Sequence, residues 1–143
     1  MVSDDFFASL VLKIIIKMDT YDIITLTVNP ALDKSTHFKG LVAEQKIRCS
    51  APRFDAGGGG INVSKAITRL GGTSLAIFTS GGPLGKMLEE LIAKELIPFE
   101  AIPIQTWTRE SFVAVDENTN SQYRFGFTGE EITDEEEQNF LNA

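Results

Sequence analysis

Four consecutive glycines, Gly57–Gly60, are followed by Asn62 and by a segment with helical spacing. Because glycine has no Cβ, the backbone N–H groups of such a loop can approach a ligand, and the positive end of the following helix points at it. Asn62 adds an amide that can both donate and accept hydrogen bonds. Asp33 comes just past the first apolar run and adds an acceptor. Together these groups suit a polyhydroxylated ligand.

Two common phosphate-binding motifs do not match this glycine stretch. The loop G-x-x-x-x-G-K-[ST] fails because no Gly-Lys follows Gly57 or Gly58 at the required offset. The later stretch GGPLGKM has Met87 where that motif needs Ser or Thr. The dinucleotide motif G-x-G-x-x-G fails at its sixth position, which is Asn62 or Val63. A structural role is also possible, in which the glycines only permit tight packing of the loop on a sheet.

The elements that must position these residues alternate strand and helix. We expect buried strands at 22–28, 74–79 and 98–104, with helices at 61–70 and 84–96 between them. The apolar face of the first helix is predicted from its spacing to contain Val63, Ile67 and Leu70. This order predicts parallel βαβ units with helices over one sheet, whose ligands bind outside the carboxyl ends of the strands.

Further short strands are expected outside this regular part. Two are predicted at 35–38 and 46–54, and a hairpin is predicted around the polar turn 117–120. They would form a small antiparallel sheet, one face of which must be covered by a ligand, the main domain or another subunit. Thr133 and Glu136 predict a capping box for a closing helix.

Composition excludes several classes of function. The net charge of −7 argues against a nucleic-acid or anionic-membrane surface, although a few local cations could still hold a small anion. The single cysteine, Cys49, fits a reducing, cytoplasmic compartment. The single histidine, His37, excludes a His-rich metal site and is expected on an exposed strand face, so no metal ligand is predicted. Residues 1–20 are predicted to be an N-terminal extension, either an upstream addition or an amphipathic helix packed on the domain.

Three stretches carry a resemblance to a known family: TLTVNPALD, GGGGINVSKAITRLGG and WTRESFVAVDENTNSQYRF. They resemble the ribokinase-like (PfkB-type) carbohydrate kinases, and within them the sugar-phosphate branch of minor 6-phosphofructokinases. The resemblance implies a partial ribokinase-like α/β fold, a three-layer α/β/α sheet with a small antiparallel β lid. Residues 21–143 would be the N-terminal, sugar-binding part, with lid segments 34–54 and 108–128.

The resemblance also implies roles for individual residues. Asp33 would accept hydrogen bonds from sugar hydroxyls, and the planar guanidinium of Arg109 would bind the sugar's phosphate. Lys46 and Arg48 would add positive charge, and Arg124 is a further candidate. These three cations could equally belong to a solvated strand face. The implied substrate-binding residues are Asp33, Lys46, Arg48, Gly57, Gly58, Gly59, Gly60, Asn62 and Arg109.

The implied activity is ATP-dependent phosphorylation of fructose 6-phosphate in glycolysis, with ATP and Mg²⁺ and a homodimer formed through the lid. Fructose 1-phosphate and tagatose 6-phosphate remain alternative substrates. The family's catalytic Gly-Ala-Gly-Asp motif does not occur in these 143 residues. We therefore expect no catalytic residue here, a chain that stops before the nucleotide-binding half, and no activity of this chain alone. A non-catalytic sugar-phosphate-binding or dimerisation module and an unrelated α/β domain are the two competing interpretations.

Overall fold

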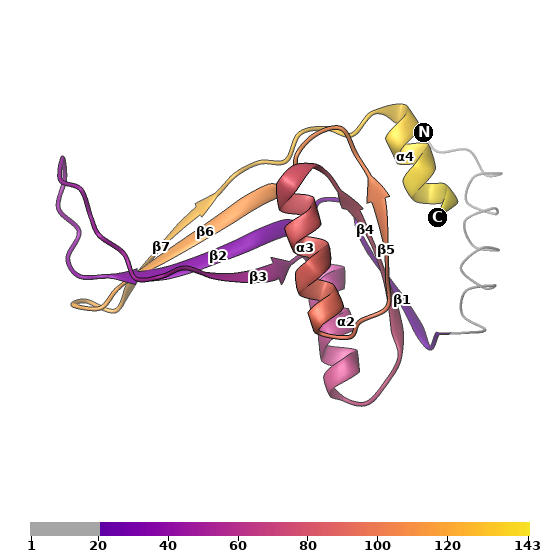
Figure 1. Cartoon of the computed structure of the whole chain (residues 1–143), viewed down its shortest axis with the longest axis horizontal. Helices are drawn as coiled ribbons and strands as arrows, with labels where there is room; N and C mark the ends of the chain where they lie inside the picture. The colour runs from indigo at the N-terminus through magenta and orange to yellow at the C-terminus, as the bar shows by residue number, and fades with distance from the viewer. Residues whose placement is uncertain (1–20) are drawn as a thin grey trace.

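The computed structural model describes residues 21–143, so the extension expected at residues 1–20 lies outside the described part. The chain builds two sheets and three helices within that part (Figure 1). In order, the elements are β1 Ile23–Thr27, β2 Ala31–Phe38, β3 Arg53–Gly57, α2 Gly59–Arg69, β4 Ser74–Ser80, α3 Gly82–Lys94, β5 Phe99–Pro103, β6 Arg109–Asp116, β7 Ser121–Gly126 and α4 Asp134–Asn142.

The first sheet has the order β1-β4-β5, and all its pairs are parallel. Helices α2 and α3 pack on one of its faces, where Phe78 of β4 and Leu88 and Ile92 of α3 are fully buried. Helix α4 packs on the other face through Phe140, which contacts the cluster that contains Leu75. The expected three-layer α/β/α arrangement is therefore confirmed.

The second sheet has the order β3-β2-β6-β7 and reaches away from the helices (Figure 1). It differs from the expected purely antiparallel sheet in one pair, because β2 and β6 run parallel. The reason lies in the first sheet. Since β1 and β5 are parallel, they end at the same edge, and the strands that follow them, β2 and β6, leave that edge in the same direction. The hairpin β6–β7 turns at residues 117–120 as predicted.

The strand expected at 46–54 is wrong over most of its length. Only Cys49 forms an isolated bridge, to Phe38, and β3 begins at Arg53. The preceding loop bends at Gly40 and Glu44, which have positive φ angles of 73° and 59°. These bends precede the expected strand, in which the pairing with β2 consists of the Phe38–Cys49 bridge and the pairs from Arg53 onward.

The predicted apolar face of α2 is wrong at Val63 and Leu70, while its third member, Ile67, is half-buried. Val63 is 49% exposed and Leu70 is 87% exposed, whereas the buried residues of the helix are Ile61, Ser64 and Lys65. Small polar groups bring α2 close to β1, because the hydroxyls of Ser64 and Thr25 are hydrogen-bonded at 2.8 Å. The helix predicted at 84–96 is confirmed as α3, and the Thr133–Glu136 capping box of α4 is confirmed. No helix in residues 21–143 has the length and apolar character needed to cross a membrane.

Candidate functional site

Asp33 lies on β2 between two other strands. Its Cα pairs with that of Asp55 on β3 and that of Ser111 on β6. The Asp33 carboxylate rests against the Cα of Gly57, the last residue of β3, because a Cβ at that position would overlap the carboxylate oxygens. Only glycine therefore lets the carboxylate lie where it does. We expected Asp33 just past a strand, but it lies within one, and its backbone is fixed on both sides.

The next three glycines differ in what surrounds them. Gly58 has a φ of 138°, and a Cβ there would lie 2.7 Å from Thr27 Cγ2. A Cβ on Gly60 would lie 2.7 Å from the carbonyl oxygen of Leu26, whereas one on Gly59 would meet nothing within 4 Å. Close packing on β1 therefore accounts for Gly58 and Gly60, so part of the glycine stretch has the structural role that the sequence left open.

Helix α2 begins without a side-chain cap. The backbone N–H of Asn62 donates to the carbonyl of Gly58 at 2.9 Å, which is the first bond of the helix. The N–H groups before it have no carbonyl four residues earlier in the helix, as at every helix start. The side chain of Asn62 is exposed and lines the same hollow as Asp33. The Asn62 amide thus offers donors in the same hollow as the Asp33 carboxylate.

This hollow, which we call the Asp33 hollow, has a volume of about 440 Å³ and lies between α2 and the second sheet. It is open to solvent on one side, and its cationic side chains outnumber its two carboxylates. A local excess of positive charge in a chain with a net charge of −7 favours an anionic ligand here. The residues that line it are Asp33, Lys34, Ser35, Arg53, Asp55, Ala56, Asn62, Lys65, Arg69, Ser111, Val113 and Arg124.

Burial raises the pKa of Asp33 above its ordinary value of 3.8, because the hollow removes part of the carboxylate's hydration. The charge of Asp55 across the strand pair acts in the same direction. A hydrogen bond from Ser111 and the charges of Arg109 and Lys65 oppose the rise. Hydroxyl groups of a ligand could therefore donate hydrogen bonds to Asp33 and replace the hydration that its carboxylate loses on burial.

Arg109, the first residue of β6, is close enough to influence Asp33 but does not line the Asp33 hollow. Its Nε donates to Asn29 Oδ1 at 3.1 Å, and its terminal nitrogens donate to the carbonyls of Asn29 and Phe127 at 3.5 Å. The guanidinium faces a narrow crevice between the β1–β2 loop and the segment after β7. The hydrogen bonds of the two terminal nitrogens are long, so these nitrogens can turn toward a ligand at little cost in free energy.

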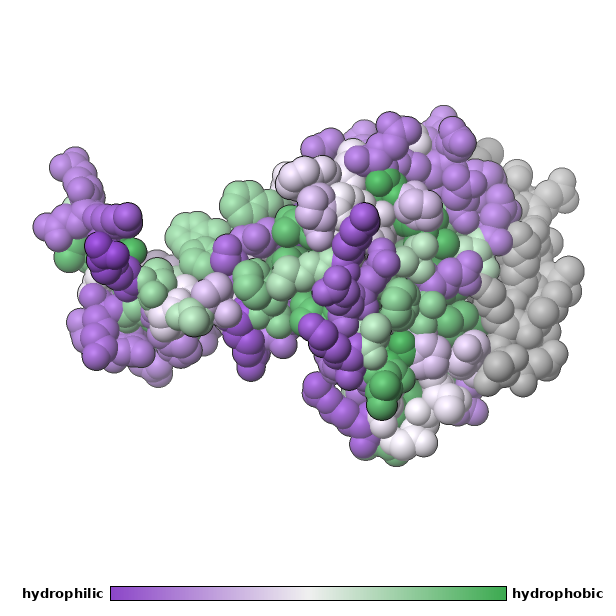
Figure 2. Space-filling model, viewed as in Figure 1, coloured by the Kyte–Doolittle hydropathy of each residue, from purple (hydrophilic) through white to green (hydrophobic). Residues whose placement is uncertain are grey.

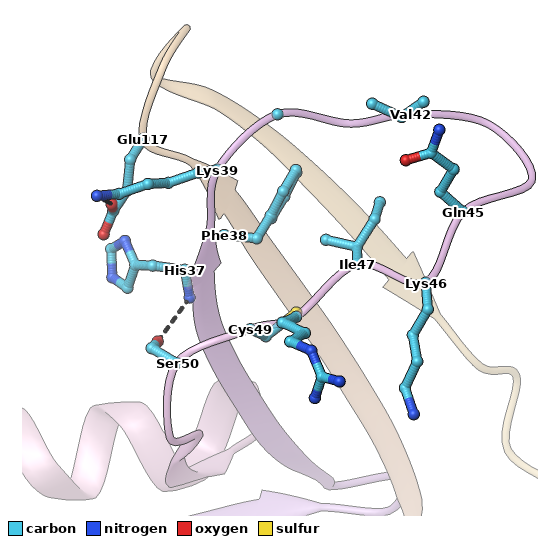
Figure 3. A pocket seen from close by; sticks show the side chains of 12 residues that line it. His37, Phe38, Lys39, Val42, Gln45, Lys46, Ile47, Cys49, Ser50 and Glu117 are labelled. Atoms are coloured by element: carbon cyan, nitrogen blue, oxygen red, sulfur yellow. Dashed lines mark hydrogen bonds and ion pairs between the residues drawn. The ribbon is translucent and has the colours of Figure 1, made fainter.

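Lys46 and Arg48 lie in the loop after β2. With His37, Cys49 and Glu117 they line a separate hollow of about 530 Å³, which we call the loop hollow (Figure 3). The structure does not bring these two cations into the Asp33 hollow. His37 is exposed on β2 as predicted, and its backbone N–H donates to Ser50 Oγ at 3.1 Å.

Arg124 on β7 does line the Asp33 hollow, together with residues that sequence reasoning did not single out: Asp55, Ser111, Lys65 and Arg69. A period of two along the strands could have found the first two. Asp55 comes two residues before Gly57, and Ser111 comes two residues after Arg109. Helical spacing could have found Lys65, which follows Asn62 by three residues.

The residues of the Asp33 hollow suit an anionic, hydroxyl-bearing molecule better than a metal ion. Within the described part of the chain, no group of three or more His, Cys, Asp or Glu side chains is arranged to hold a metal. Asp33 and Asp55 supply acceptors for hydroxyls, the Asn62 amide supplies donors, and Arg124 supplies a planar cation. The predicted glycines, Gly57–Gly60, do not themselves line the hollow.

Comparison with known proteins gives a consistent result. A family model described as "pfkB family carbohydrate kinase" matches residues 17–143. The ATP-dependent 6-phosphofructokinase isozyme 2 of Mycobacterium tuberculosis H37Rv is 46% identical over 120 residues, which make up 84% of this chain and 35% of that protein. The chain therefore spans about a third of the length of this curated relative.

Solved structures agree with the sequence match. Phosphofructokinase-2 from Escherichia coli, in complex with fructose-6-phosphate, is 41% identical with a TM-score of 0.78, over 82% of this chain and 39% of that one. The same enzyme has a tetrameric inhibited form, also 41% identical, with a TM-score of 0.77 over 82% of this chain and 39% of that one. A possible 1-phosphofructokinase from Thermotoga maritima is 33% identical with a TM-score of 0.75, over 84% and 39%.

Proposed function

Because this chain belongs to the pfkB family of carbohydrate kinases, we propose that it supplies the sugar-phosphate site and lid of an ATP-dependent kinase that phosphorylates fructose 6-phosphate. Residues 21–143 are, in this proposal, the sugar-binding part of a ribokinase-like domain. The second sheet, with segments 34–54 and 108–128, is its lid. The phosphofructokinase-2 complex with fructose-6-phosphate supports this choice of ligand.

The observation that carries the proposal is the contact between Asp33 and Gly57. The glycine brings a half-buried carboxylate to the wall of a cation-rich hollow, next to the start of a helix. Hydroxyl groups of a sugar would donate to Asp33, and the N–H groups at Gly59 and Gly60 with Asn62 would bind its other side. A bound polyol would thereby replace the hydration that the carboxylate has lost.

Positive side chains would hold the phosphate. Arg124 lines the Asp33 hollow, and Arg109 lies beside Asp33 with long hydrogen bonds that a phosphate could replace. A guanidinium is well shaped for bidentate binding of a phosphate. Lys46 and Arg48, which line the loop hollow, would add positive charge from the lid.

The lid would pair with a second copy of the chain. On the face shown in Figure 2, apolar residues gather over the second sheet. Phe125 and Phe127 are 53% and 57% exposed, and the ring of Phe125 stacks on Phe112 with centroids 5.9 Å apart. Such a surface favours association with another protein surface, and the relative with a tetrameric form supports self-association. In this proposal the partner is an identical chain, and neither nucleic acid nor a membrane is bound.

ATP would be the phosphoryl donor, with Mg²⁺ to neutralise the transferring phosphate. The base for the attacking hydroxyl and most of the nucleotide site would belong to a part of the complete enzyme outside this sequence. The chain's own residues would bind the sugar phosphate, orient its hydroxyls and exclude water. We expect residues 21–143 to bind sugar phosphate without transferring phosphate from ATP.

A second candidate is a fructose 1-phosphate kinase, which the likeness to the possible 1-phosphofructokinase favours. The two substrates place the phosphate at opposite ends of the same sugar. The substrate of a tagatose 6-phosphate kinase differs from fructose 6-phosphate in the orientation of one hydroxyl. Asp33 and Asn62 would distinguish the two orientations by their hydrogen bonds.

Isothermal titration calorimetry of the 143-residue chain tests the proposal. The ligands are fructose 6-phosphate, fructose 1-phosphate, tagatose 6-phosphate, fructose and inorganic phosphate. We expect fructose 6-phosphate to bind most tightly and Asp33→Asn to weaken it at least about tenfold, since a charged acceptor is lost. Glu137→Gln, which removes one negative charge on the exposed side of α4, is the control. Equal affinity for fructose 6-phosphate and phosphate alone would mean that the sugar is not recognised.

Adding the remainder of a phosphofructokinase relative as a separate chain tests the kinase reaction itself. Transfer from ATP only in the mixture supports the proposal. Binding without transfer in the mixture would instead favour a non-catalytic sugar-phosphate-binding or dimerisation module. Turnover by the 143-residue chain alone would refute the proposed division of roles.

A further inference from the structure

A lysine lies on the buried face of α2, where apolar side chains are usual. Lys65 is only 8% exposed, and its Nζ donates to the carbonyl oxygen of Ala56 at 2.7 Å. The same Nζ lies 3.1 Å from Glu95 Oε1, beyond the end of α3. A buried ammonium is costly unless it is paired and hydrogen-bonded, and Lys65 has both kinds of partner.

The place of this lysine connects it to the glycine loop. Ala56 immediately precedes Gly57, whose Cα supports the Asp33 carboxylate. Lys65 lies on the helix that follows the loop, so its bond to Ala56 ties the end of β3 to α2 across nine residues. The glycines between these two points have little conformational preference of their own. The Lys65–Ala56 bond therefore holds both ends of the loop in fixed positions.

The charge of Lys65 also acts on the Asp33 hollow, which it lines. Within the hollow its ammonium favours the ionised form of Asp33 and opposes the rise in pKa caused by burial. Other charged groups act there too, so the effect of Lys65 must be measured against theirs. The charged groups that face Asp33 or Lys65 are Arg53 and Asp55 on β3, Arg69 on α2, Glu95 after α3, Arg109 on β6 and Arg124 on β7. The ammonium of Lys34 lies on the other face of the sheet, over the rings of Phe54 and Phe112.

We propose that Lys65 is a positioning residue of the sugar-phosphate site: its ammonium fixes the Ala56 carbonyl and so sets the glycine loop against the Asp33 carboxylate. The proposal rests on the proposed function, because it assigns Lys65 to the same site. Lys65 does not touch the sugar in this account. It acts through Ala56, Gly57 and Asp33.

Substitutions at position 65 separate the hydrogen bond from the charge. Lys65→Met removes both, Lys65→Gln keeps a donor for the Ala56 carbonyl without the charge, and Lys65→Arg keeps both. Glu95→Gln is the matched control, because it weakens the same buried pair but leaves the ammonium in place. Glu95 does not line the Asp33 hollow.

The first measurement is the titration of the Asp33 carboxyl carbon by NMR in the free protein, which needs no ligand. We expect its midpoint to move to higher pH in Lys65→Met and Lys65→Gln and to stay in place in Lys65→Arg and Glu95→Gln. A purely structural lysine would not distinguish Lys65→Gln from Glu95→Gln. If Lys65→Met does not fold, the Asp33 titration midpoints of Lys65→Gln and Lys65→Arg are compared instead, and they show whether the charge of Lys65 acts on Asp33.

The second measurement is the affinity for fructose 6-phosphate by calorimetry. We expect Lys65→Met to bind about tenfold more weakly, the effect of losing a hydrogen bond to a charged group, and Lys65→Arg to restore binding. An unchanged Asp33 titration together with unchanged affinity in Lys65→Met would overturn the proposal. If the unmodified chain binds no sugar phosphate, the proposed function fails, and the Asp33 titration still judges the effect of Lys65 on the site.

Discussion

The two sheets of this chain differ in how completely they are buried. All seven residues of β4, in the middle of the first sheet, are buried, whereas β7, at the edge of the second, has no buried residue. The first sheet has helices on both faces, and the second reaches beyond them (Figure 1). The first sheet therefore supplies the stability of the fold, and the second presents polar and aromatic groups to other molecules.

The Asp33 hollow lies where the two regions meet. Asn62 and Lys65 come from a helix packed on the first sheet, and Asp33 and Arg124 come from the second sheet. Groups on α2 are held by a close-packed core, while β7 is held by pairing with β6 and by ring contacts such as that of Phe125 with Phe112. We infer that the rigid side of the hollow sets the position of the sugar and the exposed side can adapt to it.

Two phenylalanines give the largest expected difference between the regions. Phe78 of β4 is fully buried, so Phe78→Ala should lower the free energy of unfolding by about 3–5 kcal/mol. Phe125 of β7 is 53% exposed, and Phe125→Ala should cost the monomer about 1 kcal/mol or less. Urea denaturation at low protein concentration measures both. Equal losses would mean that the second sheet is as important to stability as the first.

Two glycines sharpen the comparison at the boundary between the regions. In Gly57→Ala the new methyl group would overlap the Asp33 carboxylate, so we expect a loss of about 2 kcal/mol from overpacking. In Gly59→Ala the methyl group would meet nothing within 4 Å, and the helix should gain about 0.5 kcal/mol.

Urea denaturation again gives the free energies, and calorimetry with fructose 6-phosphate shows whether Gly57→Ala also weakens binding. The two variants add the same methyl group two residues apart, so each is the other's control. A destabilised Gly59→Ala would contradict the open surroundings of that residue.

The stability of each region depends on pH through one carboxylate, Glu136 in α4 and Asp116 in β6. Glu136 accepts from the backbone N–H groups of Thr133 and Gln105, and these bonds lower its pKa below the ordinary value of 4.5. Because the folded pKa is lowered, the stabilisation is present above pH 4.5 and is lost as the pH falls through the folded value. Glu136→Gln should therefore lower the urea midpoint at about pH 7 and have less effect near pH 3.

Asp116 is the equivalent carboxylate of the second sheet. The backbone N–H groups of Gly40 and Asn118 donate to it at 3.0 Å and lower its pKa below 3.8. We expect Asp116→Asn to speed hydrogen exchange at Gly40 and Asn118 at neutral pH and to change the global urea midpoint less than Glu136→Gln. The reverse order would show that the far end of the second sheet unfolds together with the core.

Sequence patterns predicted the core better than the site, for a physical reason. The parallel strands, α3 and the capping box of α4 depend on local apolar spacing and local hydrogen bonds, which a sequence displays directly. The buried face of α2 escaped prediction because it contains Ser64 and Lys65, whose partners, Thr25 and Glu95, come from other elements. The period of two along their strands relates Asp55 to Gly57 and Ser111 to Arg109, but their place beside Asp33 is set by strand register, which depends on contacts distant in sequence.

Asp33 gives the smallest expected effect on stability and the clearest contrast between fold and site. Burial raises its pKa, so the folded state binds a proton more readily than the unfolded chain. Above its ordinary value of 3.8, ionised Asp33 therefore opposes folding, and Asp33→Asn should slightly raise the urea midpoint at about pH 7 but not near pH 3. The same substitution should weaken binding of fructose 6-phosphate. If a residue serves ligand binding alone, replacing it does not destabilise the free protein. A lower urea midpoint of Asp33→Asn at neutral pH would therefore show that the carboxylate supports the fold.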